Sequence, residues 1–301
     1  MNLRHLRYFI EIAATGNLRR ASEVLYVTQS ALSRAIVELE AELGCVLLER
    51  DQRGVHPTRQ GLVFAQGAQR LLAELESLRA EVLAEGTEPV GHVRLAMPIG
   101  LRERITRPLV KQLQAGFPNV RVDIIDGNAH ENRAAVLEGA ADVVVMQELD
   151  RGLPLNYRRL YVDPLCLVGP KSAGFDMGRT LPQSALAGRP LLQIRAPNQI
   201  RWLVDSALRR VSAPAEPTME ISSSIIQLDL VEDGHGYTVL PRSLLLEALQ
   251  ERRISAAPLS KMSVTWVAAW QKGRQPTRAV QIALDTLLEI SAGVSAALRT
   301  R

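Results

Sequence analysis

Hydrophobic residues make up 47% and charged residues 23% of the 301-residue chain, a balance that is typical of folded globular proteins and excludes wholesale disorder. The length exceeds one average domain and favours two or three compact units. The formal net charge of +4 is small, so a nucleic-acid site would depend on where the cations lie rather than on bulk charge. No apolar run reaches about 18 residues and Glu11 interrupts the first apolar stretch, so we expect a cytoplasmic protein with no membrane partner.

The chain has two cysteines, Cys45 and Cys166, which are far apart and match no metal-ligand spacing. We therefore expect neither a disulfide framework nor a zinc site, and we expect the protein to work in a reducing compartment. We predict no metal and no cofactor.

Three regions follow one another along the chain. Residues 1–58 contain short helical segments and a glycine-containing turn, and residues 59–87 form one long amphipathic helix. Residues 88–301 alternate between strand and helix patterns, which is typical of an α/β domain. The joint is expected at residues 85–89, where a helix-stopping glycine is followed by proline.

In the first region, apolar residues at helical spacing predict three helices. The first helix ends at Gly16, the second begins near Leu18, and the third runs from an N-cap at Thr28 to Gly44. Two short helices joined by a tight turn, with small polar and cationic residues at the start of the second, describe a helix-turn-helix.

The start of the third helix carries residue types that can read DNA, because Gln can pair with adenine, Arg with guanine, and Ser with a base edge or phosphate. Any solvated helix face also shows such residues, so spacing alone leaves both interpretations open. Two short strands around residues 51–54 predict a wing whose arginines would meet phosphates or the minor groove, although a simple surface hairpin is the alternative. The predicted DNA-contacting residues are Thr28, Gln29, Ser30, Ser33, Arg34, Arg50 and Arg53.

The segments NLRRASEVL (residues 17–25) and VTQSALSR (27–34) resemble those of the LysR-type transcriptional regulators. LEAELG (39–44), LLER (47–50) and TRQG (58–61) follow in that family's order. Ser30 departs from the proline usual in the family, which should alter base preference, and Leu48 replaces a commoner phenylalanine in the core. The resemblance implies a winged helix-turn-helix domain that binds double-stranded DNA at two half-sites, with RNA polymerase as a further candidate partner.

The long helix places apolar residues at steps of three and four, a spacing that pairs one helix with another. Packing on its own domain is the alternative, but the resemblance also implies that this helix pairs two DNA-binding heads. A homodimer or a homotetramer would be consistent with the apolar spacing and with the resemblance. The predicted dimerisation residues are Phe64, Leu71, Leu75, Leu78 and Val82.

From Gly91 onward, repeated strand-helix-strand units predict parallel sheets. We expect two sheets joined near residues 161–164 and 261–264, which would form lobe I (about 91–161 and 266–292) and lobe II (about 162–265) with a cleft between them. The segment GHGYTVLP (234–241) is similar to one in the LysR effector domain, and that resemblance implies a fold like that of periplasmic binding proteins.

The resemblance places a small-molecule effector in the cleft, where helix N-termini favour an anion. Asn128, Asn198 and Ser223 could instead be helix caps, and Arg195 could be a surface charge. Gly100 stands where many members carry Ser or Thr, which removes the usual hydroxyl contact, and the apolar Met97 and Ile99 indicate a partly nonpolar effector. The residues carried over are Pro98, Ile99, Gly100, Leu101, Asn128, His130, Gln147, Arg195, Asn198 and Ser223.

No sequence motif of an enzyme is present: the chain lacks a Gly-x-Ser-x-Gly elbow, a His-Glu-x-x-His helix and a phosphate-binding Gly-x-x-x-x-Gly-Lys loop. The alternative to a regulator is a solute-binding protein or an enzyme on a periplasmic-binding-like fold. An enzyme gives no reason for the helix-turn-helix, and a secreted binding protein would need a signal peptide. We therefore predict a DNA-binding transcriptional regulator, not an enzyme, that is controlled by a small effector.

Overall fold

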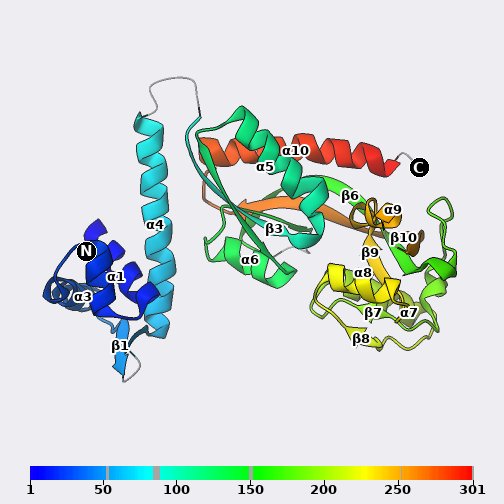
Figure 1. Cartoon of the computed structure of the whole chain (residues 1–301), viewed down its shortest axis with the longest axis horizontal. Helices are drawn as coiled ribbons and strands as arrows, with labels where there is room; N and C mark the ends of the chain where they lie inside the picture. The colour runs from blue at the N-terminus through cyan, green and yellow to red at the C-terminus, as the bar shows by residue number, and fades with distance from the viewer. Residues whose placement is uncertain (52–53, 84–88, 149–151, 252, 300–301) are drawn as a thin grey trace. The chain divides into compact units, whose positions relative to one another are not determined.

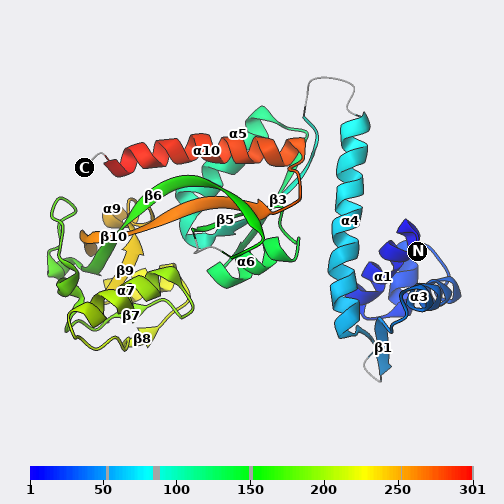
Figure 2. The same cartoon turned by 180° about the vertical axis from the view of Figure 1, so that it is seen from behind.

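The computed structural model describes residues 1–51, 54–83, 89–148, 152–251 and 253–299. The chain divides into two compact units, one of Met1–His92 with Glu138–Ala140 and the other of Val93–Leu137 with Ala141–Arg301. We refer to them as the N-terminal and C-terminal units and describe each by itself (Figures 1 and 2).

The N-terminal unit is helical with one small hairpin. Its elements are α1 (Leu3–Thr15), α2 (Leu18–Leu25), α3 (Gln29–Leu43), β1 (Leu48–Asp51), β2 (Gly54–Pro57) and α4 (Arg59–Leu83). Asn17 and Thr28 cap α2 and α3 with their side chains, and left-handed Gly16 and Gly44 end α1 and α3. The predicted helix ends therefore follow from local capping chemistry.

Partly buried hydrogen bonds fix the hairpin of the N-terminal unit to its helices. The Glu40 carboxylate accepts from the backbone N–H groups of Leu47 (2.7 Å) and Leu48 (3.0 Å). The α4 helix starts so close to β1 that a Cβ atom added to Gly61 would lie 2.0 Å from the Leu47 carbonyl oxygen. Only glycine fits at this position without displacing backbone.

The C-terminal unit is built on one six-stranded mixed sheet of order β4-β3-β5-β10-β6-β9. Its strands are β3 (Gly91–Pro98), β4 (Val120–Gly127), β5 (Val143–Gln147), β6 (Leu155–Pro170), β9 (Thr238–Pro241) and β10 (Ile254–Gln271). The β3–β5 pair is parallel, but β10 runs antiparallel to β5 and β6. The expectation of parallel sheets was therefore wrong for the centre of the sheet, where a strand that returns along the sheet from the other lobe has to pair in the opposite sense.

The expectation of two separate sheets was also wrong. The long strands β6 and β10 pass through residues 161–164 and 261–264 without a break and pair with each other. Their register shifts between Pro258 and Ser263, where Lys261 has a positive φ of 56°. The two lobes therefore share one sheet with an irregularity at the crossover. A separate two-stranded parallel sheet, β7 (Leu192–Gln193) with β8 (Met219–Glu220), lies in lobe II.

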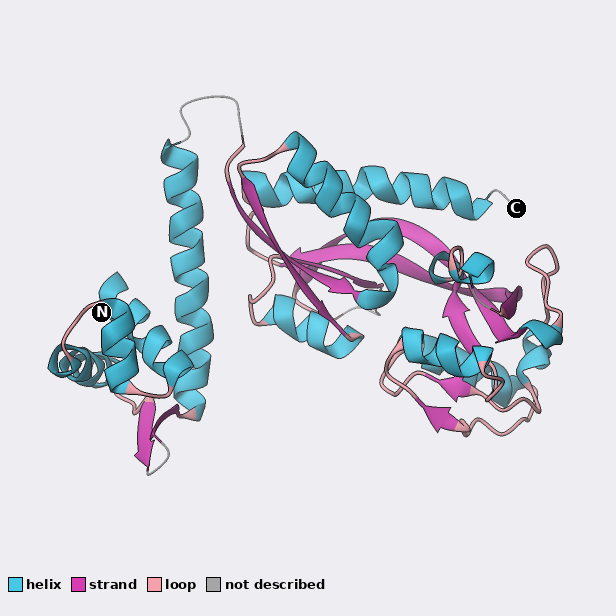
Figure 3. Ribbon diagram, in the orientation of Figure 1, coloured by secondary structure: helices cyan, strands magenta, loops and turns pink. Residues whose placement is uncertain are grey.

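Helices cover the sheet, with α5 and α10 on one side and α6 on the other (Figure 3). The helical elements are η1 (Ile99–Leu101), the π-helical η2 (Arg102–Thr106), α5 (Arg107–Gly116), α6 (Ala129–Leu137), η3 (Lys171–Ala173), η4 (Gln183–Leu186), α7 (Gln199–Arg210), α8 (Ser224–Glu232), η5 (Arg242–Leu244), α9 (Ala248–Glu251) and α10 (Arg278–Arg299). By length and composition alone α10 could cross a membrane, but half of its apolar stretch is buried inside the unit. It packs on β6 and α5 as a core helix does.

Candidate functional site

The first turn of α3 presents the predicted DNA-contacting side chains on an exposed face. Gln29, Ser30 and Arg34 are exposed, and Ser33 is half-buried. The Thr28 hydroxyl accepts the Ala31 N–H at 3.2 Å and therefore serves as the helix cap. Gln29 and Arg34 remain available to meet a base edge or phosphate. The Ser30 hydroxyl lies within hydrogen-bonding distance (3.1 Å) of the Thr28 hydroxyl and is exposed.

The wing contacts this helix directly. An Arg50 guanidinium nitrogen donates to the Ser33 hydroxyl at 3.1 Å, which brings two predicted residues 17 positions apart into contact. Within the hairpin, the Nε2 atom of His56 lies 3.5 Å from a carboxylate oxygen of Asp51. Arg53 lies outside the described residues. Sequence reasoning did not single out Arg19 and Arg20, which are exposed in the first turn of α2, the other helix of the motif. The sequence signal that could have located them is Asn17, the cap of α2, which directly precedes this turn.

The α4 helix leaves an apolar surface uncovered. The side chains of Leu71, Leu78 and Val82 are 52%, 55% and 73% exposed. Between α1 and α4 lies a groove of about 490 Å³. It is lined by Met1, Asn2, Leu3, Leu6, Leu71, Glu74, Leu75 and Leu78.

Phe64, assigned to the same seam from the sequence, packs inside its own unit. Its ring meets Phe9 edge to face, with 5.0 Å between centroids and 86° between planes. The spacing of apolar residues cannot tell an internal partner from an external one. We therefore place Phe64 in the core of the N-terminal unit and begin the candidate dimer surface at Leu71.

The C-terminal unit holds a cavity of about 100 Å³ between its lobes, which we call the effector pocket because the resemblance places an effector there. The ends of β3 and β5 and the start of α6 form its lobe I side. Its lobe II side is formed by Ile194, Asn198, Ile200, Ser222, Ser224, Leu240, Pro241 and Leu244. Seven of the ten residues carried over from the resemblance line it: Pro98, Ile99, Gly100, Leu101, Asn128, Gln147 and Asn198.

The other three, His130, Arg195 and Ser223, do not line this pocket. His130 and Arg195 are exposed. Ser223 accepts the Ile226 N–H at 3.4 Å as the cap of α8, while Ser224 beside it lines the pocket.

Sequence reasoning also missed pocket residues that come from distant segments. Asn132, Leu244 and Trp266 line the pocket, and no local motif marks them. A Cβ atom at Gly100 would lie 2.8 Å from Leu244 Cδ2 and 3.2 Å from the Ser224 hydroxyl. The lobes therefore meet at Gly100, because this position carries no side chain.

Among the described residues that line the effector pocket, none has a charged side chain. The helix ends that face it are already capped: the Asn128 amide oxygen accepts the His130 N–H at 2.9 Å, and the Asn198 oxygen accepts the Ile200 N–H at 2.8 Å. The pocket therefore offers apolar surface with amide and hydroxyl groups.

A buried carboxylate ties the pocket to the crossover strands. Asp163, on β6, is fully buried. It accepts from the Ser243 hydroxyl (2.6 Å), the Ser243 N–H (3.1 Å) and the Trp266 indole N–H (3.0 Å). Burial raises the pKa of Asp163 above its usual range, although these hydrogen bonds oppose the shift.

Neither cysteine belongs to a cluster, since the described residues contain no group of three or more His, Cys, Asp or Glu side chains able to hold a metal. Cys45 is in the N-terminal unit and Cys166 in the C-terminal unit. Burial raises the pKa of Cys166 to about 12. Its thiol therefore stays protonated and unreactive near neutral pH.

Comparison with known proteins gives matches along almost the whole chain. Residues 3–62 match the family model of the bacterial regulatory helix-turn-helix protein of the lysR family, and residues 86–292 match the LysR substrate binding domain. The nitrogen assimilation regulatory protein nac of Klebsiella aerogenes is 32% identical over 246 residues, which cover 81% of this chain and 79% of that protein.

Two solved structures share the fold. Full-length CbnR in complex with its target DNA has a TM-score of 0.71 at 22% identity and covers 98% of this chain and 100% of its own. A full-length OxyR variant from Pseudomonas aeruginosa has a TM-score of 0.72 at 22% identity, over 97% and 94% of the two chains.

Proposed function

The chain belongs to the LysR family of DNA-binding transcriptional regulators, which are not enzymes, and from this membership we propose how it reads DNA and what controls it. It is a cytoplasmic homodimer that recognises two half-sites through α3 and the wing, and an uncharged small molecule in the effector pocket alters that binding.

The observation that carries the DNA proposal is the exposed start of α3 with Arg50 bound to Ser33. This contact fixes the wing beside the recognition helix, so that one docking step can place α3 in the major groove and Arg50 near the backbone. Arg34 supplies the fork of donors that pairs with guanine.

Selection of bound sequences from random duplex DNA, at fixed salt and with excess nonspecific competitor, tests the DNA proposal. We expect two half-sites related by a two-fold axis, with centres one or more helical turns apart. Arg34→Ala should weaken binding to the selected site by about 1–3 kcal/mol. Arg34→Lys keeps the charge and loses the bidentate fork. If Arg34→Lys binds as the wild type does, Arg34 contacts phosphate and not a base, and if no sequence is enriched the proposal fails.

The effector we propose is largely apolar and carries a hydrogen-bonding group. The sequence predicted an anion, but the pocket lining offers no cationic side chain and its helix ends are capped. An ion transferred to such a site would lose hydration without a partner. The amide side chains of Asn132 and Gln147 suit a neutral polar group.

Aromatic probes of similar size that differ in charge test the charge of the effector. We expect benzyl alcohol and benzamide to raise the unfolding temperature of the full chain more than benzoate at the same concentration. Quenching of tryptophan fluorescence should accompany binding, because Trp266 lines the pocket. Stronger stabilisation by benzoate would return the proposal to an anionic effector.

The dimer we propose pairs the α1–α4 grooves of two chains. Exposed Leu71 and Leu78 would fill the partner's groove beside Leu3, and this burial of apolar surface drives association. A homodimer or a homotetramer serves the two half-sites equally, and RNA polymerase is the partner we expect at the promoter.

A further inference from the structure

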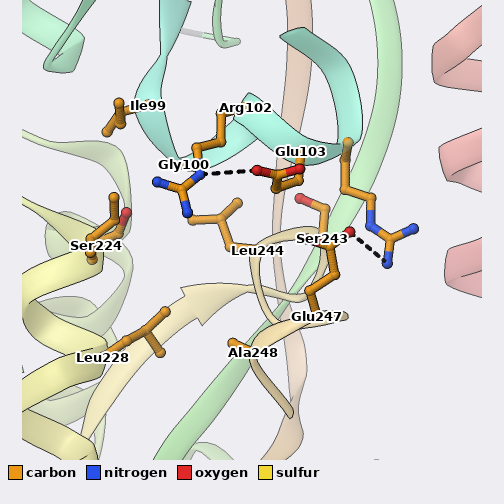
Figure 4. Close-up of a pocket in the computed structure, with 12 residues that line it drawn as sticks. Ile99, Gly100, Arg102, Glu103, Ser224, Leu228, Ser243, Leu244, Glu247 and Ala248 are labelled. Carbon is orange, nitrogen blue, oxygen red and sulfur yellow. Dashed lines mark ion pairs between the residues drawn. The ribbon is translucent and has the colours of Figure 1, made fainter. Parts of the chain in front are cut away.

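A second cavity, of about 100 Å³, is drawn in Figure 4. It shares lining residues with the effector pocket and therefore lies beside it. Residues 99–104 of lobe I border it on one side, and residues 224–228 and 243–248 of lobe II border it on the other. Four residues line both cavities: Ile99, Gly100, Ser224 and Leu244. The close contact of Gly100 with Leu244 therefore forms a wall between them.

The two cavities differ in charge. Four ionisable side chains line the second one: Arg102, Glu103, Arg104 and Glu247. We call it the charged cavity. The hydrogen bond that Arg107 donates lowers the pKa of Glu103, which keeps its carboxylate ionised near neutral pH. The lining thus holds two positive and two negative groups and has no net charge.

These charges do not fully satisfy one another. Arg102 pairs with its neighbour Glu103 at 3.3 Å within lobe I. The pair that crosses the lobes, Arg104 with Glu247, is 3.8 Å long, well beyond the 2.7–2.9 Å of a charge-assisted hydrogen bond. The Arg104 Nε atom is buried and has no hydrogen-bond partner. Leaving such a donor unsatisfied is costly, so the cavity has unused capacity for a polar ligand.

The alternation of charge selects the kind of ligand. A lone anion would be attracted by the arginines and repelled by Glu103 and Glu247, and a lone cation would meet the reverse. A molecule that carries both charges a few ångströms apart satisfies both sets. Its carboxylate would lie toward Arg102 and the Ser224 hydroxyl, and its ammonium toward Glu247.

We propose that the charged cavity is a second ligand site, separate from the effector pocket, and that it binds a small zwitterion of the α-amino acid class. The volume restricts the ligand to a compact side chain. Because such a ligand contacts both lobes, it stabilises the arrangement of the lobes that forms the cavity. The wall at Gly100 and Leu244 then couples the two sites, and the coupling is reciprocal.

Calorimetry and thermal unfolding of the full chain test this site without DNA and without the effector. The probes are glycine, L-alanine, acetate and methylammonium at matched ionic strength. We expect saturable binding of glycine or L-alanine, and at least tenfold weaker binding of acetate and of methylammonium. Equal binding of acetate and glycine would overturn the zwitterion assignment, and no saturable amino-acid binding up to about 10 mM, a concentration that still detects a binding free energy near −3 kcal/mol, would overturn the site.

Charge-removing variants place the binding within the cavity. Arg102→Gln and Glu247→Gln change side chains that are 56% and 44% exposed, so both variants should fold. Each should weaken amino-acid binding at least tenfold. Arg121→Gln removes a cation from the exposed surface of β4 and should leave binding unchanged. Binding that survives both cavity variants would locate the ligand elsewhere and refute the proposal.

Discussion

The N-terminal unit and the effector pocket are assembled by contacts of very different sequence separation. In the N-terminal unit the Thr28 hydroxyl caps α3 by accepting an N–H group three residues away, and the Glu40 carboxylate accepts N–H groups seven and eight residues away. In the C-terminal unit Asp163 reaches Ser243 and Trp266, which are 80 and 103 residues away. Local chemistry determines the DNA-binding head, whereas the pocket exists only once the sheet has formed.

The largest effect we expect comes from filling the closest local contact in the head. Gly61→Ala would place a methyl group 2.0 Å from the backbone oxygen of Leu47, where no side chain can yield. We expect a loss of more than about 3 kcal/mol in the stability of the N-terminal unit, together with loss of DNA binding. Urea unfolding followed by circular dichroism, and DNA titration, measure the two effects.

Gly67→Ala is the matched control on the same helix. An added Cβ there lies 3.7 Å from the nearest side-chain atom, an Arg70 guanidinium nitrogen, and touches no backbone. We expect a gain of about 0.5–1 kcal/mol from higher helix propensity. A Gly61→Ala protein as stable as this control would show that the hairpin can move away from α4 at no cost. The close contact of Gly61 with Leu47 would then not determine the structure of the head.

A smaller effect, on dimerisation, tests whether the exposed apolar surface of the head needs a second chain to cover it. Leu78→Glu puts a charge into the proposed dimer groove, and we expect the dimer to weaken by more than about 2 kcal/mol, over tenfold. Sedimentation velocity across a concentration series measures it. Leu62→Glu is the control, since Leu62 is similarly exposed but lies on the opposite side of an ideal helix from Leu71. A Leu78→Glu protein that stays dimeric would remove α4 from the interface.

The contrast between local and long-range contacts also explains which features could be predicted from the sequence. Thr28, Gly16 and Gly44 were predicted as helix ends because each acts on its own turn. Apolar spacing likewise located the long helix, yet it could not tell that Phe64 packs inward on Phe9 while Leu71 stays exposed. That distinction depends on a partner outside the repeat.

The pocket shows the opposite limit. Family resemblance located Pro98 and Gln147 by position, whereas Trp266 had no local signal, because β10 brings it in by pairing with β5 and β6. The same pairing overturned the expectation of two parallel sheets. Charge was also invisible at this level: Arg195 suited a carboxylate but is exposed outside the pocket.

A long-range contact can be tested as the local one was. Gly100→Ala would bring a methyl group to 2.8 Å from Leu244 Cδ2 and should cost about 1–3 kcal/mol of C-terminal unit stability, because packed side chains must shift. Leu244→Ala added to it should restore part of the loss, a coupling that a double-mutant cycle measures by urea unfolding.

Gly116→Ala serves as the reference in the same unit, since nothing lies within 4 Å of a Cβ atom at that position. It should change stability little. Strict additivity of Gly100→Ala and Leu244→Ala would mean that the lobes do not press on each other at this wall. The reciprocal coupling of the two cavities would then lose its physical basis.

The smallest effect is a pH dependence at the crossover, where Asp163 holds Trp266 and Ser243. Burial raises the pKa of Asp163 in the folded chain, so the folded state binds this proton more tightly than the unfolded state does. The stabilising contribution of that proton is complete below the unfolded pKa of about 3.9. It is lost as pH rises through the raised folded value.

Asp163→Asn keeps the shape of the side chain and cannot ionise, so its hydrogen-bonding penalty does not depend on pH. We expect the stability of the wild type relative to this variant to decline as pH rises above about 4, the unfolded pKa, by an amount set by the upward shift. Free energies of unfolding in urea at several pH values measure the difference. A difference that grows with pH would mean that the donors Ser243 and Trp266 outweigh burial and hold the carboxylate ionised. The crossover would then be stabilised by an internal charge, as the head is by Glu40, but through contacts that are 80 and 103 residues apart rather than seven and eight.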